Sequence, residues 1–279
     1  MKYRIVMDSC GEIPEELKGR EEFVSIPLTL TIHGEDIVDD GHVSCEELVK
    51  KIAADPECPK TACPSPEAFM RAADCDADRV YIITLSAELS GSYQSAVIGM
   101  NMLLDDRPDI KIHVFNSVSA SVGMTLILKK IVELEEKGLS FEDVVIGAQK
   151  YTEEKNTFFV LDNLDTLRKN GRLSRMKGLA ASVLKIKPVC IGTENGEIAQ
   201  IDQARGINKA IQKMVRHVIE ATPDPASKIL GIAYCNCPDR AEIVRDAICA
   251  NMKVKDVVMV ETGGVSTVYS NDGGIMVVI

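Results

Sequence analysis

Residues 79–104 read RVYIITLSAELSGSYQSAVIGMNMLL, and this stretch carries the pattern that decides the fold. Residues 79–85 form a short apolar run rich in β-branched side chains, which predicts a buried strand. A Ser-Gly-Ser turn follows, and the residues after it predict a helix from about 93 to 104. A buried strand that leads through a turn into a helix is the repeating unit of a doubly wound α/β sheet.

The same alternation of strands and helices extends along the rest of the chain. Ser44-Cys45-Glu46-Glu47, for example, has the form of a capping box and predicts a helix to about residue 54. In the second half, Asn195-Gly196 separates two apolar segments and predicts a β-hairpin, so the later sheet should contain antiparallel pairs. We therefore predict an α/β protein of two lobes. Residues 1–155 should form an N-terminal lobe with a mainly parallel sheet, and residues 156–279 a C-terminal lobe with a mixed sheet.

Composition excludes several classes of protein. The 279 residues are 46% hydrophobic, which is enough for a sizeable core, and the formal net charge of −10 argues against a nucleic-acid partner. The nine cysteines contain no Cys-x-x-Cys pair, so we expect reduced thiols and no metal site. The apolar runs are too short to span a bilayer and no signal peptide is apparent, so we expect a cytoplasmic protein without stable membrane insertion.

One segment has the opposite charge to the rest of the chain. Between Thr166 and Thr193 there is no Asp or Glu, although the chain as a whole is acidic. A solvated helix face and a docking surface for an acidic partner both explain such a segment. Its basic residues are Arg168, Lys169, Arg172, Arg175, Lys177, Lys185 and Lys187.

Two clusters of small hydroxyl residues are candidate binding loops. Ser90-Gly91-Ser92 lies between a predicted strand and a helix, where ligands of open α/β sheets bind and where the helix dipole favours an anion. Thr61 opens a second cluster, in a predicted loop before a helix that Ser65 caps. Taken alone, each cluster is better explained as a plain helix cap, although two loops in one lobe can face a shared anion.

Signatures of other chemistries are absent from the sequence. It contains no Gly-x-Ser-x-Gly, no phosphate loop and no Gly-x-Gly-x-x-Gly after the first strand, and the four histidines show no motif spacing. Asp8-Ser9 follows the first predicted strand, where it can ligate a metal or simply end the strand. We therefore predict no catalytic residue, no metal and no cofactor.

Taken in order along the chain, these motifs resemble those of the DegV family. The first strand ends in Asp8-Ser9, residues 60–66 (KTACPSP) are similar to the family's Thr-Ser-Gln-Pro-Ser loop, and residues 89–96 (LSGSYQSA) are similar to its Leu-Ser-Gly-Thr-Tyr-Gln-Ser-Ala. Residues 164–175 match its Leu-x-x-Leu-x-x-Gly-Gly-Arg-Ile, and Ile186-Lys187-Pro188 follows.

The resemblance implies a carrier that holds a long-chain fatty acid, of palmitate or oleate type, in a tunnel between two lobes. Carried over by position, Thr61 and Ser90 would bind the carboxylate, with the backbone N–H groups at Gly91 and Ser92 assisting. The resemblance also implies a fatty acid kinase as partner, which makes an acyl phosphate from the bound acid. Arg172 and Arg205 match arginines linked to phosphate transfer or kinase docking.

The chain departs from the family pattern near its C-terminus. Tyr269-Ser270-Asn271-Asp272-Gly273 stands where the family has His-x-Gly-Pro-Gly. Tyr269 can donate a hydrogen bond to the ligand, but it cannot carry a proton near neutral pH as histidine does. Two alternatives therefore stay open: an enzyme, a transferase or hydrolase for a small acyl or phosphorylated substrate, and a lipid-responsive regulatory protein.

Overall fold

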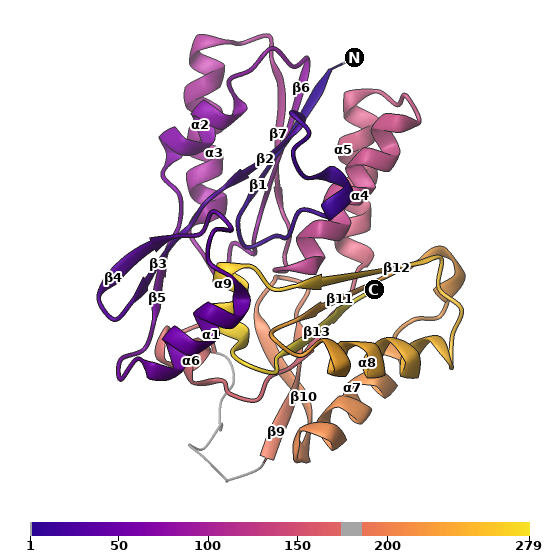
Figure 1. The fold of residues 1–279 in the computed structure, drawn as a ribbon. Coiled ribbons are helices and arrows are strands. Elements are labelled where there is room, and N and C mark those ends of the chain that lie inside the picture. Colours follow the sequence, from indigo (N-terminus) through magenta and orange to yellow (C-terminus); the bar gives the residue numbers. More distant parts are fainter. Residues whose placement is uncertain (1, 174–185) are drawn as a thin grey trace.

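The computed structural model describes residues 2–173 and 186–279 (Figure 1). Its first sheet has the strand order β2-β1-β6-β7, and every neighbouring pair is parallel. This confirms the parallel sheet predicted for the first part of the chain. Its strands are β1 (Tyr3–Asp8), β2 (Phe23–Ile26), β6 (Arg79–Thr84) and β7 (Lys111–Asn116).

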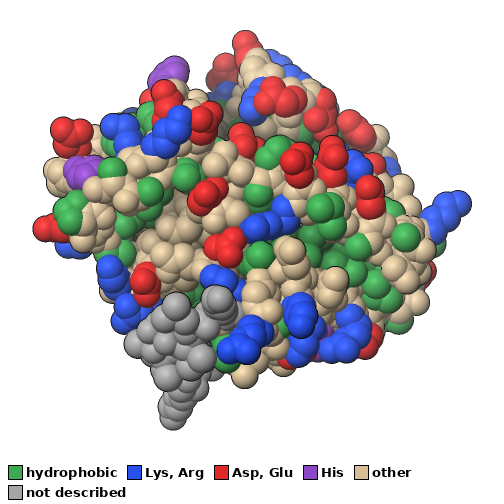
Figure 2. Space-filling model, turned by 60° about the horizontal axis from the view of Figure 1, so that its bottom comes forward, with side chains coloured by type: hydrophobic (Ala, Val, Ile, Leu, Met, Phe, Trp, Pro, Cys, Tyr) green, Lys and Arg blue, Asp and Glu red, His purple; other side chains and the backbone are tan. Residues whose placement is uncertain are grey.

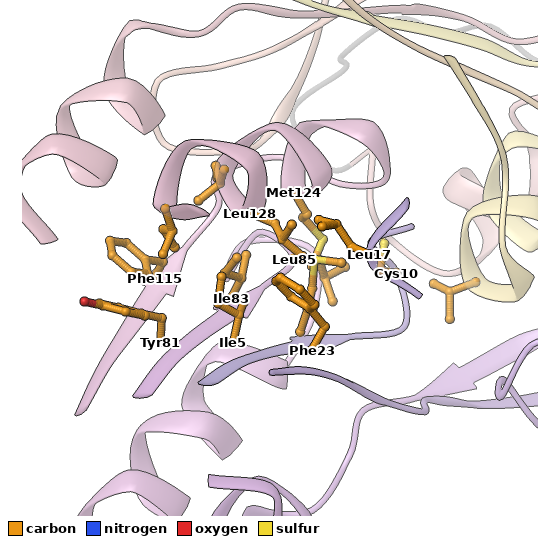
Figure 3. Packing of buried hydrophobic residues seen from close by; sticks show 14 of the residues in the cluster. Ile5, Cys10, Leu17, Phe23, Tyr81, Ile83, Leu85, Phe115, Met124 and Leu128 are labelled. Atoms are coloured by element: carbon orange, nitrogen blue, oxygen red, sulfur yellow. The ribbon is translucent and has the colours of Figure 1, made fainter. Parts of the chain in front are cut away.

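Alternate residues of this sheet enter two different cores because successive side chains of a strand point to opposite faces. Val6 packs with Phe69 on the face covered by α2 (Pro66–Ala73) and α3 (Ser92–Asp106). Ile5 packs with Tyr81 and Met124 on the other face, which α4 and α5 cover (Figures 1 and 3). These two helices are α4 (Val122–Glu136) and α5 (Phe141–Glu154).

The second sheet is mixed, as predicted. Its order is β10-β9-β8-β13-β11-β12, in which β11 and β12 are parallel and the other pairs antiparallel. The Asn195-Gly196 hairpin joins β9 to β10, and Gly196 takes a φ of 84° that glycine tolerates well. The strands are β8 (Thr157–Val160), β9 (Ile186–Gly192), β10 (Ile198–Arg205), β11 (Ile229–Tyr234), β12 (Asp256–Glu261) and β13 (Ile275–Val278).

Helices on both faces of the second sheet bury it. On one face, α7 (Ile207–Glu220) and α8 (Pro238–Cys249) enclose a core with the sheet (Figure 1). On the other face, Val122 and Leu126 of α4 pack against Ala233 and Val278. Because α4 also packs on the first sheet, this one helix connects the two halves of the molecule. Two 3₁₀ helices, η1 (Glu15–Leu17) and η2 (Pro225–Ser227), complete the connections.

A small third sheet was not expected from the sequence. It is antiparallel, with the order β4-β3-β5, and consists of β3 (Thr29–Ile32), β4 (Glu35–Val38) and β5 (Lys60–Ala62). Thr61 therefore lies in a strand, opposite Leu30, and the prediction that it lies in a loop was wrong. A three-residue strand is too short to show alternation, and its pairing with β3 depends on residues some thirty positions away.

The start of α1 (Cys45–Ala54) is as predicted. Ser44 accepts a hydrogen bond from the Glu47 backbone N–H and the Glu47 side chain accepts one from the Ser44 backbone, so the capping box is complete. Helix α1 lies between the small sheet and the second half of the chain (Figure 1).

Two further short helices belong to the second half. They are α6 (Asp165–Lys169) and α9 (Gly264–Ser270). Although α9 comes late in the chain, its Val265 and Val268 enter the same core as Ile5. The second sheet begins at Thr157, and the division into lobes near residue 155 stays a prediction. Among the described residues, no helix has both the length and the apolar character needed to cross a membrane.

Candidate functional site

An apolar cavity lies between the ends of the first sheet's strands and the second sheet. The empty space in and around it is about 870 Å³, which includes space open to solvent at its mouth. The cavity is bounded by the ends of β6 and β7, by strands of the second sheet, and by α6 and α9. Its apolar wall consists of Leu85, Leu89, Val118, Phe159, Leu161, Leu167, Ile198, Ala233, Val265, Ile275 and Met276.

Thr61 and Tyr269 meet at one edge of this cavity. The Thr61 Oγ1 and the Tyr269 hydroxyl are 2.9 Å apart, although 208 residues separate them. Tyr269 lines the cavity, and the Arg172 guanidinium lies 5.9 Å from the centre of its ring. The structure therefore brings a strand of the small sheet, a helix of the second half and a cation together at one place.

The Ser90-Gly91-Ser92 turn approaches the same edge from β6. A Cβ atom at Gly91 would lie 3.2 Å from the Cys63 Sγ, so the chain that leaves β5 passes directly over the turn. The two hydroxyl clusters are thus neighbours. Ser90 and Gly91 line an open depression that shares Leu89 with the apolar cavity.

Ser92 has a different environment from Ser90. Its side chain is fully buried, and its hydroxyl lies 3.2 Å from that of Ser90. The Ser92 backbone N–H donates to the Ser90 Oγ at 3.2 Å. Ser92 therefore holds the turn in place, whereas Ser90 is half-buried and faces the depression.

Arg172 joins these parts from the segment after α6. It lines both the apolar cavity and the open depression, and its Nε donates to the Leu89 carbonyl at 3.1 Å. Its Nη1 donates to the Asn170 carbonyl. The Asn170 amide in turn donates to the Pro59 carbonyl at 3.0 Å, which ties the segment to the strand that carries Thr61.

Arg205 lies apart from the cavity. It is the last residue of β10, it is exposed, and it is paired in register with Ile186. Of the cations in the basic segment, Arg168 pairs with Asp165 at 3.0 Å and Lys187 lies 3.6 Å from Asp162. Arg175, Lys177 and Lys185 lie outside the described residues.

Asp8 is the buried carboxylate beneath the site. Its Oδ2 accepts from the Leu85 N–H at 2.9 Å and its Oδ1 from the Cys10 N–H at 3.2 Å. Burial raises its pKa to about 7, against the opposing effect of these hydrogen bonds and of one from Ser92. Among residues 2–173 and 186–279, no group of three or more His, Cys, Asp or Glu is placed to hold a metal. Asp8 instead fixes the loops at the end of β1.

Exchanging Asp8 for asparagine should change how stability depends on pH. Folding raises the pKa of Asp8 from 3.8 to about 7. The contribution of this group to the free energy of unfolding is therefore complete below about pH 4 and is lost as the pH rises through 7. Between pH 5 and 8, we therefore expect the unfolding free energy of the wild type to fall relative to that of Asp8→Asn. Over this range the fall is at most about 3 kcal/mol, because it proceeds at about 1.4 kcal/mol for each pH unit only up to about pH 7. Urea denaturation of both proteins at a series of pH values measures this difference. If the unfolding free energies of the two proteins changed in parallel with pH, the account would be wrong.

No motif in the sequence indicated the residues that hold α9 and thereby Tyr269. The Asp39 carboxylate accepts from the Gly264 N–H at 2.9 Å and from the Val265 N–H at 3.0 Å, and Glu12 accepts from the Gly263 N–H at 3.1 Å. Both carboxylates come from the first half of the chain. The only signal in the sequence was the Gly263-Gly264 pair, which marks a close approach of two backbones.

Gly264→Ala should destabilise the protein. A Cβ atom there would lie 2.2 Å from the Asp39 Oδ1 and 3.0 Å from the Leu30 Cδ1, so the start of α9 would have to move. We expect a loss of about 2–4 kcal/mol of unfolding free energy in urea denaturation. Gly263→Ala is the matched control, because its new Cβ would meet atoms only at 3.6 Å and beyond. Equal losses in the two variants would contradict this account.

Comparison with known proteins shows a match to one family over nearly the whole chain. The family model described as "Uncharacterised protein, DegV family" matches residues 2–279. A DegV domain-containing protein of Streptococcus pneumoniae is 33% identical over 254 residues, which are 91% of this chain and 89% of the relative.

Solved structures of the same family also match nearly the whole chain. A DegV family protein from Ruminococcus gnavus, refined with vaccenic acid, has a TM-score of 0.96 and 48% identity, with 99% of both chains covered. The fatty acid kinase B3 protein of Streptococcus pneumoniae, loaded with linoleic acid, has a TM-score of 0.90 and 32% identity, with 100% of this chain and 99% of that chain covered. The resemblance noted in the sequence is confirmed, and the chain belongs to the DegV family.

Proposed function

We propose that this protein binds one long-chain fatty acid in the cavity between its two sheets. The observation that carries the proposal is that the apolar cavity ends where Thr61, Tyr269 and Arg172 come together, beside Ser90. A wall of aliphatic side chains suits an acyl chain, whereas hydroxyl groups and a cation suit a carboxylate. The fatty acids carried by the R. gnavus and S. pneumoniae proteins support this assignment.

The acyl chain supplies most of the binding free energy in this proposal. Burying about 14 methylene groups at ~0.8 kcal/mol each contributes roughly 11 kcal/mol before the cost of ordering the chain. Each hydrogen bond to the charged carboxylate adds about 1.5–3 kcal/mol. Thr61, Ser90 and Tyr269 therefore orient the head group, with the backbone at Gly91 and Ser92 shaping the turn, and the cavity wall provides affinity.

Calorimetric titration of the delipidated protein with oleate tests the proposal. One molecule of oleate should bind per chain, and decanoate should bind much more weakly because its shorter chain buries fewer methylene groups. Equal affinity for the two acids would show that the cavity wall does not hold the chain. No uptake of either acid would contradict the assignment of the ligand class.

We further propose that the protein is a carrier which presents the carboxylate to a partner kinase for acyl-phosphate formation. Arg172 lies at the place where the carboxylate would be, so it can also meet a phosphate brought by the partner. Lys and Arg side chains gather along the lower edge of the face in Figure 2. Arg205 is exposed at the end of β10, so it is assigned to contact with the partner rather than with the fatty acid.

Arg205→Glu should separate binding from presentation. Because Arg205 lies away from the cavity, we expect fatty-acid affinity to change by less than about threefold. In an assay with the cognate kinase and ATP, reversing the charge at the contact should lower acyl-phosphate formation at least about tenfold. Lys253→Glu, on the connection before β12, is the control for surface charge. Equal rates for both variants would remove Arg205 from the proposed contact.

A further inference from the structure

Two cysteine thiols from opposite halves of the chain lie against each other. Cys45 is the first residue of α1, and Cys235 comes directly after β11. Their Sγ atoms are 3.7 Å apart, although 190 residues separate them in sequence. Both side chains are buried. Neither the cavity nor the proposed carboxylate site requires two thiols at this position.

Hydroxyl groups surround the sulfur of Cys45. The Thr267 Oγ1 lies 3.4 Å from it and the Thr262 Oγ1 3.6 Å. The Cys235 thiol also hydrogen-bonds to Cys45, and this bond is the largest of the effects that lower the Cys45 pKa. The same bond raises the pKa of Cys235. Cys45 is therefore the thiol of the pair that ionises first, and the thiolate is the reactive form.

The pair lies directly behind the wall of the apolar cavity. Thr262, which contacts Cys45, also lines the cavity, and so does Ala233, two residues before Cys235. A small neutral oxidant in the cavity is thus separated from Cys45 by one threonine side chain. This places the pair within reach of hydrogen peroxide, although both side chains are buried.

We propose that Cys45 and Cys235 are a disulfide-forming site that joins the two halves of the protein when it reacts with hydrogen peroxide. The Cys45 thiolate attacks one peroxide oxygen, the O–O bond breaks, and the hydroxide that leaves takes up a proton to become water. The Cys235 sulfur then attacks the sulfur of the Cys45 sulfenic acid. The S–O bond breaks, and the hydroxyl group leaves as a second water with the Cys235 proton. Two thiols are oxidised and one peroxide is reduced.

The geometry requires only a small movement. The two sulfur atoms must approach from 3.7 Å to about 2.05 Å, the length of a disulfide bond. Cys45 begins a helix and Cys235 lies just beyond a strand end, so each can shift without breaking the middle of an element. The link would hold the start of α1 against the end of β11.

Peptide mapping after peroxide treatment tests the proposal. The full-length protein is treated with hydrogen peroxide, quenched in acid, blocked with N-ethylmaleimide and digested with trypsin. Cys45 is the one cysteine in residues 21–50, and Cys235 lies in residues 229–240. We expect these two peptides joined, with the loss of the mass of two hydrogen atoms, and separated again by dithiothreitol.

Cys237 provides the matched control because it lies in the same tryptic peptide. Its thiol faces the Gly274 carbonyl oxygen at 3.6 Å and not Cys45. Cys237→Ser should keep the linked peptide, and Cys235→Ser should lose it. We also expect the melting temperature of the oxidised wild type to rise by at least about 5 °C, because the link closes a very long loop in the unfolded chain.

Two outcomes would overturn the proposal. One is oxidation of the exposed Cys63 and Cys249 without any linked peptide. The other is a linked peptide that survives in Cys235→Ser and disappears in Cys237→Ser. Neither measurement involves a fatty acid, so the result is independent of the function proposed above.

Discussion

Replacing both Thr61 and Ser90 with alanine is expected to weaken fatty-acid binding at least about 100-fold. Each hydroxyl contributes a hydrogen bond to a charged carboxylate, worth about 1.5–3 kcal/mol, so the two together contribute at least about 3 kcal/mol. The loss should be nearly the same for acids of different chain length, because the substitutions change the head-group site and leave the cavity wall intact. Isothermal titration calorimetry with oleate and with palmitoleate measures the loss of affinity and shows whether it depends on chain length.

The control for this experiment removes two hydroxyls from elsewhere. Thr31 lies in β3 beside Thr61, and its hydroxyl donates to Asp36 at 2.8 Å on the exposed side of the small sheet. Ser227 ends η2, and its hydroxyl donates to the Asp224 carbonyl at 3.1 Å. The double variant Thr31→Ala, Ser227→Ala should bind oleate as the wild type does. If the Thr61 and Ser90 double variant also binds as the wild type does, the carboxylate lies elsewhere.

The second large effect should follow from filling the cavity with Ala233→Phe. Ala233 is buried in β11 and lines the cavity, so a phenyl ring there would occupy space assigned to the acyl chain. Displacing about six methylene groups costs roughly 5 kcal/mol, which corresponds to a loss of affinity of about 1,000-fold or more. The loss should be largest for long acids and small for decanoate, since a short chain does not reach the whole cavity.

A control on the same strand separates this effect from general damage to the sheet. Ile232 is the neighbour of Ala233, but its side chain enters the core under α7 and α8. Ile232→Val should therefore cost about 1 kcal/mol of stability and leave oleate affinity unchanged. Circular dichroism melting curves establish that both variants are folded. If Ala233→Phe is folded and binds long acids normally, the cavity does not hold the acyl chain.

The features that the sequence predicted well are local. The capping box of Ser44 and Glu47 and the Ser65 cap of α2 depend on residues three apart, and both are found as expected. The strand at 79–84 and the Asn195-Gly196 hairpin were also predicted, because a buried apolar run and a turn residue with positive φ leave direct signals in the chain.

The features that the sequence did not predict depend on contacts between distant residues. Strand β5 exists because residues 60–62 pair with β3, and α9 is held by Asp39. For the same reason, the sequence pointed to Thr61 and Tyr269 separately but gave no sign that their hydroxyls would be 2.9 Å apart. The approach of Cys45 to Cys235 is a third contact of this kind.

Native mass spectrometry of the freshly purified protein, followed by solvent extraction of any bound molecule, tests the central claim most directly. The account predicts a one-to-one adduct with the mass of a long-chain fatty acid, and the extract should identify its chain length. A chain that carries no adduct under gentle conditions, and that takes up neither palmitate nor oleate when these are added, would contradict it.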